Sequence, residues 1–226
     1  MRRTRRPEVR RGPDVKQPGA VIALVGAEST GKTALSIALR DALAGEGHDA
    51  VVVAEYLREF CEREGRTPTR EEQPGLAAEQ TRRIAVAAER HEIVVADTTA
   101  LMTAVYSDQV FRDASLYAGA ESVHARYGAT LLTALDLPWR ADGLQRDGAQ
   151  VLAPVDARLR AALQRAGAPF AVVSGIGPAR LTAALASVRR ALNPPLDDAA
   201  GPRWRWVCER CGDAHCEQQH LLPRMP

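Results

Sequence analysis

The stretch Gly26-Ala27-Glu28-Ser29-Thr30-Gly31-Lys32-Thr33 matches the phosphate-binding pattern G-x-x-x-x-G-K-[ST] at every fixed position. An apolar run at residues 21–25 precedes it, and leucines and alanines at helical spacing follow it over residues 34–44. A strand that leads through a glycine-rich turn into a helix directs backbone N–H groups and the positive end of the helix dipole at one point. The stretch therefore predicts a polyphosphate site rather than a chance glycine-rich turn.

The composition is that of a globular chain with little net charge. Of its 226 residues, 46% are hydrophobic and 26% are charged, and 30 basic side chains nearly balance 28 acidic ones. Such a length suits one α/β domain of roughly 170–190 residues with tails. The balanced charge gives no field that would favour nucleic acid or membrane as the main partner. Because no secretory signal and no apolar stretch of membrane-spanning length are present, we expect a cytoplasmic protein.

Strand and helix patterns alternate along the predicted domain, residues 20–193. Short, continuous apolar runs predict five strands at residues 21–25, 50–54, 93–96, 129–135 and 170–173. Helical spacing follows or separates them at residues 34–44, 57–64, 75–90, 100–110, 116–126, 155–165 and 178–192. This alternation predicts an α/β fold of the P-loop NTPase type, with a parallel five-stranded sheet, helices on both faces and a short lid.

Two segments flank this domain. Residues 1–19 contain six arginines and little apolar surface, so we expect a disordered basic arm. The arm could contact nucleic acid or anionic lipid, and we favour the alternative of a solvated tail. Residues 194–226 begin as a linker and end in a segment rich in cysteine and histidine.

The last segment has the ligand spacing of a metal site. Cys208, Cys211, Cys216 and His220 follow the pattern C-x2-C-x4-C-x3-H, and His215 could replace His220. Four such ligands are enough for tetrahedral Zn²⁺. Because so short a segment has little core, the metal would supply most of its folding free energy. We favour a structural zinc site over a reduced disordered tail or redox chemistry.

The loop and an aspartate predict how ATP and Mg²⁺ are bound. Residues 26–33 are expected to cradle the phosphates, with Lys32 reaching the β- and γ-phosphates and the Thr33 hydroxyl binding Mg²⁺. Asp97 directly follows the apolar run at residues 93–96, which is the Walker B arrangement of a carboxylate that holds Mg²⁺ directly or through water. A helix is expected to begin beside it, so Asp97 could also serve as the N-cap.

Glu55 follows the second apolar run, and ligands of open α/β sheets lie outside the carboxyl ends of the strands. A carboxylate there could accept the proton of a hydroxyl that attacks the γ-phosphate, the alternative being a solvated strand-end glutamate. Next to it, Tyr56 could stack on a ring and Arg58 could pair with a charged group.

Residues 136–148 mix proline, glycine and charge over a length typical of a mobile lid. Arg140 and Arg146 could stabilise charge on the transferring phosphoryl group, and Trp139 could cover an aromatic ligand. An ordinary exposed loop is the alternative.

Four segments together resemble the ribosylnicotinamide kinase domain of NadR-type proteins, within the P-loop AAA-type ATPases. They are the loop itself, residues 54–60 (Ala-Glu-Tyr-Leu-Arg-Glu-Phe), residues 96–99 (Ala-Asp-Thr-Thr) with Tyr106 after them, and residues 137–143 (Leu-Pro-Trp-Arg-Ala-Asp-Gly). The likeness extends from about residue 21 to residue 192. Its second and fourth segments are more specific than the loop, which many NTPases share.

The resemblance implies ATP with Mg²⁺ and phosphorylation of a nucleoside-like hydroxyl, typically the 5′-hydroxyl of nicotinamide riboside. It makes Glu55 the base or a ribose ligand, places Tyr56 and Trp139 near the pyridine ring, and adds Arg58 and Asp142 to the substrate-binding set. A regulatory P-loop ATPase whose zinc tail and basic arm bind a protein or nucleic-acid partner is the alternative. A nucleic-acid-binding zinc protein alone would leave the loop unexplained.

Overall fold

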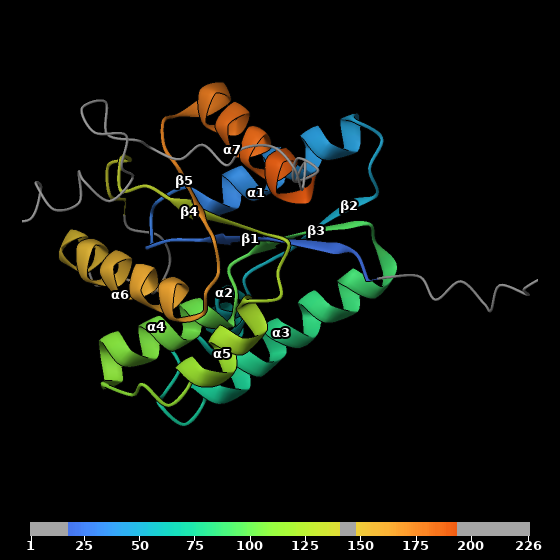
Figure 1. Ribbon diagram of the computed structural model, residues 1–226. Coiled ribbons are helices and arrows are strands. Elements are labelled where there is room, and N and C mark those ends of the chain that lie inside the picture. Colours follow the sequence, from blue (N-terminus) through green and yellow to red (C-terminus); the bar gives the residue numbers. More distant parts are fainter. Residues whose placement is uncertain (1–17, 141–147, 194–226) are drawn as a thin grey trace, which may run out of the picture. The chain divides into compact units, whose positions relative to one another are not determined.

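A five-stranded parallel sheet is the middle layer of the computed structural model, which describes residues 18–140 and 148–193 (Figure 1). Its strands are β1 (Ala20–Val25), β2 (Ala50–Val53), β3 (Ile93–Asp97), β4 (Ala129–Thr133) and β5 (Ala171–Val173). They lie in the order β2-β3-β1-β4-β5, and every pair of neighbours is parallel. The predicted α/β class and parallel sheet are confirmed.

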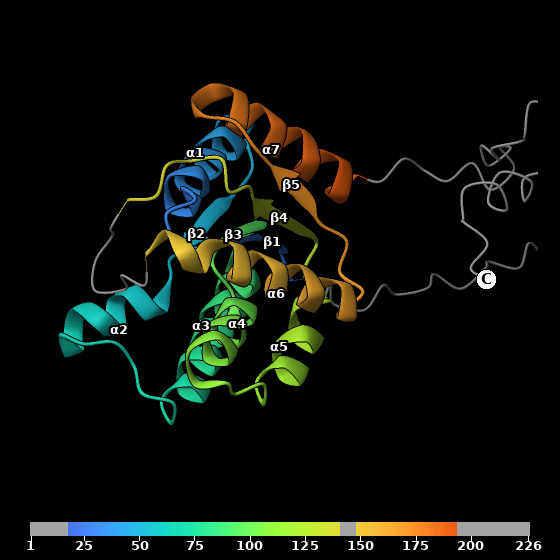
Figure 2. The same ribbon diagram turned by 90° about the vertical axis from the view of Figure 1, so that its left-hand side faces the viewer.

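Helices cover both faces of the sheet (Figures 1 and 2). On one face lie α1 (Lys32–Gly45) and α7 (Gly177–Leu192), and on the other lie α3 (Gln73–Arg90), α4 (Ala100–Phe111), α5 (Tyr117–His124) and α6 (Leu152–Arg165). The shorter α2 (Tyr56–Glu64) follows β2, and a 3₁₀ helix, η1 (Ala149–Val151), precedes α6. Each predicted helix is present, and its ends lie within a few residues of the predicted ones.

The apolar runs form strands because both of their faces are covered. In β1, Ile22 and Leu24 pack with Leu39 and Leu43 of α1, whereas Val25 packs with α4 and α6. Burying one such side chain contributes about 1.5–3 kcal/mol to the stability of the fold. Because side chains on both faces of β1 are buried, packing on both sides stabilises the centre of the sheet. This rigid centre fixes the position of the loop that follows β1.

The register of the sheet brings the predicted site segments to one edge. Leu24 of β1 pairs with Asp97 of β3, and Val53 of β2 pairs with Ala96 of β3. Because the strands are parallel, the phosphate loop, Glu55 and Asp97 lie at strand ends on the same side of the sheet. The helices that follow the neighbouring strands β1 and β4 lie on opposite faces, and the crevice at such a reversal is where open α/β sheets bind ligands.

Several predictions concern residues outside the described ranges and stay predictions. They involve the basic arm, the middle of the predicted lid and the tail rich in cysteine and histidine, with the residues Asp142, Arg146, Cys208, Cys211, Cys216 and His220. Within residues 18–140 and 148–193, no group of three or more His, Cys, Asp or Glu could hold a metal ion. In the same ranges, no helix is both long and apolar enough to cross a bilayer.

The N-cap of α4 is Thr99, and the expectation that Asp97 caps this helix is wrong. The Thr99 hydroxyl accepts from the backbone N–H of Leu101, because the helix begins at Ala100 while Asp97 still belongs to β3. The Thr99 hydroxyl also lies 3.2 Å from Nδ1 of the buried His124, whose Nε2 lies 3.0 Å from Oγ1 of Thr130. His124 thus joins α5 to β4 and to the start of α4.

His124 should make the protein less stable as the pH falls. Burial lowers its pKa to about 4 from an ordinary value of 6.5, so the unfolded chain takes up the proton first. The stabilisation is complete above about pH 6.5 and falls by about 1.4 kcal/mol per pH unit toward pH 4. Urea unfolding between pH 4 and 7 should show a smaller pH slope for His124→Gln than for the wild type. Equal slopes would show that another group causes the dependence.

Candidate functional site

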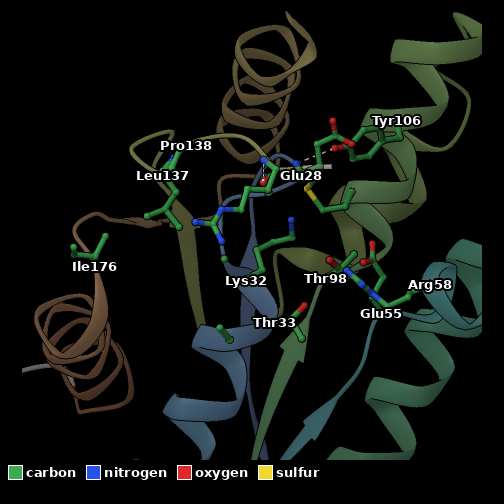
Figure 3. Close-up of a pocket in the computed structure, with 15 residues that line it drawn as sticks. Glu28, Lys32, Thr33, Glu55, Arg58, Thr98, Tyr106, Leu137, Pro138 and Ile176 are labelled. Carbon is green, nitrogen blue, oxygen red and sulfur yellow. Dashed lines mark hydrogen bonds between the residues drawn. The ribbon is translucent and has the colours of Figure 1, made fainter. Parts of the chain in front are cut away.

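A cavity of about 610 Å³ lies around Lys32 (Figure 3). It is lined by the phosphate loop, by the start of α2, by the β3–α4 junction and α4, and by the segments that follow β4 and β5. Pockets for small ligands usually have volumes of about 300–1,000 Å³. The cavity therefore has room for a small molecule at the edge of the sheet where the predicted site segments meet.

Two glycines and a pair of hydroxyls set the shape of the loop. Gly26 has a φ of 152°, and a Cβ on it would lie 2.0 Å from Oγ1 of Thr133 in β4. Gly31, immediately before α1, has a φ of 76°, which side chains rarely tolerate. The Thr30 and Thr133 hydroxyls are 2.7 Å apart, and Thr30 donates to the Ala27 carbonyl at 2.7 Å. The loop is therefore bonded both to itself and to β4.

Lys32 is the first residue of α1 and folds back over the loop, where its Nζ donates to the Ala27 carbonyl at 2.8 Å. Burial lowers the pKa of Lys32 below its ordinary value, and the charge of Arg58 acts in the same direction. Three carboxylates act in the opposite direction, in decreasing order Glu55, Asp97 and Glu28. A bound polyanion would likewise favour the charged ammonium.

The end of β3 supplies buried oxygens that lack partners. The side chain of Asp97 is only 2% exposed, and its Oδ1 has no hydrogen-bond partner among the described residues. The Thr98 hydroxyl is also buried and unpaired within those ranges. Thr98 and Thr33 line the cavity. Asp97 directly precedes Thr98 and is the last residue of β3. Because a native protein rarely leaves a buried carboxylate oxygen unpaired, the residues present fit a hard cation held by Thr33 and Asp97.

Of the three site residues predicted after β2, two lie at the cavity and one points away from it. Glu55 and Arg58 line the cavity (Figure 3). The ring of Tyr56 lies instead under the guanidinium of Arg83, whose Cζ is 4.3 Å from the ring centroid, and Tyr56 is not among the lining residues. Arg83 is itself paired with Glu59. The structure therefore brings Glu55 and Arg58 together with Lys32 but turns Tyr56 toward α3.

The segment after β4 is fastened to the variable positions of the loop. The Trp139 indole Nε1 donates to Oε1 of Glu28 at 3.1 Å, and the Arg140 backbone N–H donates to the Ser29 hydroxyl at 2.7 Å. Arg140 lines the cavity, and Trp139 does not. This part of the predicted lid thus lies against the loop, with the indole used as a hydrogen-bond donor.

Sequence reasoning missed two buried polar residues that hold the site together, Arg180 and Gln80. Each lies in a mostly apolar buried stripe, in α7 beside Ala184 and Val188, and in α3 between Leu76 and Ile84. The α3 stripe contains one further buried polar residue, Gln73. A polar residue in such a stripe is the signal that would have identified both. Tyr106, noted only as part of the resemblance, accepts from the backbone N–H of Glu28 at 3.1 Å and lines the cavity.

Arg180 ties the loop to two other segments. It is 5% exposed, and its Nη2 donates to the Thr30 carbonyl at 2.8 Å. Its Nη1 donates to the Gly175 carbonyl at 2.9 Å and to Oδ1 of Asp136 at 3.1 Å. Partial burial alone would raise the pKa of Asp136, but the Gly175 N–H and the Arg180 charge hold that pKa below its ordinary value. One guanidinium thus joins the loop, the end of β4 and the β5–α7 turn.

Replacing Arg180 with leucine should lower the free energy of unfolding by about 3 kcal/mol, because two backbone carbonyls and a carboxylate lose their donor. Arg189→Leu is the matched control, since Arg189 lies on the same helix in an exposed ion pair with Glu46 and should cost under about 1 kcal/mol. Urea unfolding monitored by circular dichroism measures both. Equal losses in the two variants would contradict the role given to Arg180.

Comparisons with known proteins agree with this geometry. The AAA domain family matches residues 21–180. A solved structure of NadR protein in complex with NR has a TM-score of 0.63, and one of NadR protein in complex with NAD and AMP-PNP has a TM-score of 0.58. Each is 18% identical to this chain and covers 77% of it. The chain covers 51% and 50% of them, about half of their length. No curated protein matches the chain. The NadR-like fold expected from the sequence is confirmed.

Proposed function

The chain belongs to the AAA domain family, and on that basis we propose that it is an ATP-dependent phosphotransferase acting on a nucleoside-like hydroxyl of the nicotinamide riboside type. One observation carries the proposal: Lys32 of the phosphate loop and Glu55 of the β2 end line the same cavity. A lysine for the phosphates and a carboxylate for the attacking hydroxyl are the two groups that such a transfer needs. The NadR proteins of similar fold were solved with NR, NAD and AMP-PNP.

The loop and the start of α1 would hold the triphosphate of ATP. Backbone N–H groups of the loop and the positive end of the dipole of α1, which begins at Lys32, would face the phosphates. Lys32 would exchange the Ala27 carbonyl for phosphate oxygens, which removes the cost of its burial. Thr33 and Asp97 would hold Mg²⁺, which when bound offsets charge on the phosphate oxygens.

Glu55 would act on the acceptor. Its carboxylate takes the proton of the hydroxyl, the hydroxyl oxygen bonds to the γ-phosphorus, and the bond between that phosphorus and the bridging oxygen breaks to release ADP. Lys32 and Arg140, with Arg146 of the predicted lid, offset the charge that develops. Arg58, Met102 and Tyr106 also line the cavity, and in this proposal they would contact the acceptor.

Tyr56, Trp139 and Asp142 complete the proposed substrate-binding set, and the first two lie outside the cavity lining. Tyr56 would support the position of α2 through Arg83, and Trp139 would keep the segment after β4 on the loop through Glu28. A cytoplasmic setting, where ATP is abundant, and a structural zinc in the tail belong to the same proposal.

Cooperative binding of nucleotide and acceptor tests the assignment before any turnover is measured. We expect nicotinamide riboside, or another nucleoside of a panel, to raise the melting temperature more in the presence of AMP-PNP and Mg²⁺ than in their absence. A ligand present at 100 times its Kd adds about 2.7 kcal/mol to stability. Stabilisation by AMP-PNP alone, with no member of the panel adding to it, would contradict an acceptor site.

A further inference from the structure

Gln80 is buried beneath the site and bonds to the ends of two strands. It lies in α3, is 3% exposed and does not line the cavity. Its Oε1 accepts from the Tyr56 backbone N–H at 2.8 Å. Its Nε2 donates to the carbonyls of Ala54 and Thr98, both at 3.3 Å. One side-chain amide therefore connects the chain after β2 with the chain after β3.

The bonds to Gln80 replace strand pairing at the point where it stops. Pairing between β2 and β3 ends with Val53 opposite Ala96. Beyond this pair, the segment after β2 turns into α2, and the segment after β3 passes through Thr98. The φ of Thr98, 83°, is unusual for a residue with a side chain. An amide can accept from one N–H and donate to two carbonyls at the same time. A carboxylate could not donate, and an apolar side chain would leave all three backbone groups unpaired.

The three bonded residues flank the groups proposed for catalysis. Glu55 lies between Ala54 and Tyr56, and Asp97 directly precedes Thr98. We propose that Gln80 is a positioning residue that sets the separation between the Glu55 carboxylate and the Asp97 end of β3, and so between the acceptor hydroxyl and the γ-phosphate. This inference rests on the function proposed above. A displacement of about 1 Å in such a geometry costs about 100-fold in rate, so a residue outside the cavity can control turnover.

Two variants test the role of Gln80. Gln80→Met keeps the approximate length of the side chain and removes every hydrogen bond, and Gln80→Glu keeps the acceptor for Tyr56 and removes both donors. We expect each to lower kcat with ATP and the acceptor by about 10- to 100-fold. The Kd for ATP should change by less than about threefold, because Gln80 makes no bond to the phosphate loop. This separation of kcat from ATP affinity distinguishes positioning from a general loss of structure.

Ile84→Val is the matched control. Ile84 lies one turn further along the same stripe of α3, where it packs with Val21, Val53 and Val94. The Ile84→Val variant loosens the packing of α3 on the sheet and keeps all three Gln80 hydrogen bonds to the backbone at residues 54, 56 and 98, so kcat should stay within about twofold of the wild type. The inference is overturned if the Gln80 variants lower kcat no more than Ile84→Val, or if the Kd for ATP rises in parallel with the loss of kcat. Failure of the wild type to phosphorylate any acceptor would instead contradict the proposed function itself.

Discussion

Replacing Lys32 with alanine should lower kcat for phosphoryl transfer by about 100- to 1,000-fold, because the variant loses the cation that faces the β- and γ-phosphates. Folding should not suffer. Burial lowers the pKa of Lys32, so the folded protein carries the cost of a buried ammonium that alanine does not have. Steady-state kinetics with saturating ATP and acceptor, together with urea unfolding, measure both effects on one preparation.

The control for Lys32→Ala is Arg40→Ala. Arg40 is on the same helix, its side chain is paired with Asp41, and it does not line the cavity. Its removal should leave kcat within about twofold of the wild type and change stability by less than about 1 kcal/mol. A Lys32→Ala protein that kept more than a tenth of the wild-type kcat would place the phosphates somewhere other than over the loop.

Replacing Glu55 with glutamine should lower kcat by about 100- to 10,000-fold, the usual contribution of a general base. The same substitution should leave ATP binding unchanged or make it tighter. Among the neighbouring charges, the Glu55 carboxylate has the largest effect on the pKa of Lys32. The variant removes this negative charge from the place where phosphates would bind. The Kd for ATP, measured by calorimetry, should therefore stay the same or fall while turnover is lost.

Glu59→Gln is the matched control for Glu55. Glu59 follows in α2 at the exposed surface, where it pairs with Arg83, and it does not line the cavity. The variant should keep wild-type kcat and lose less than about 1 kcal/mol of stability. If Glu55→Gln had the same kcat as Glu59→Gln, Glu55 would be the solvated strand-end glutamate that the sequence left as the alternative.

The layered fold could be predicted because each strand and each helix has its own hydrophobic pattern in the sequence. Short apolar runs become strands where helices cover both faces, and the loop pattern fixes the turn after β1 through Gly26 and Gly31. The parallel register then brings Glu55 and Asp97 to the edge that holds the loop. These parts of the site follow from strand order and from the alternation of elements.

The remaining parts depend on contacts between segments far apart in the chain. The Tyr56 side chain turns toward Arg83 because α2 begins at Tyr56 itself, and the direction in which a helix leaves a strand is set by its packing on α3. Trp139 finds a partner in Glu28, across more than a hundred residues of sequence. Arg180 and Gln80 hydrogen-bond to backbone carbonyls at strand ends and in the loop, which carry no side-chain signature. In the sequence, Arg180 and Gln80 stand out only as polar residues within mostly apolar helical stripes.

Transfer of the γ-phosphate is the central claim, and one measurement tests it most directly. The full chain is incubated with ATP, Mg²⁺ and nicotinamide riboside or another nucleoside of the panel, and mass spectrometry counts ADP and phosphorylated nucleoside. The account predicts one phosphorylated nucleoside for each ADP, with both products lost in Glu55→Gln. ADP formed at the same rate with no phosphorylated acceptor would contradict the phosphotransferase and support the regulatory ATPase.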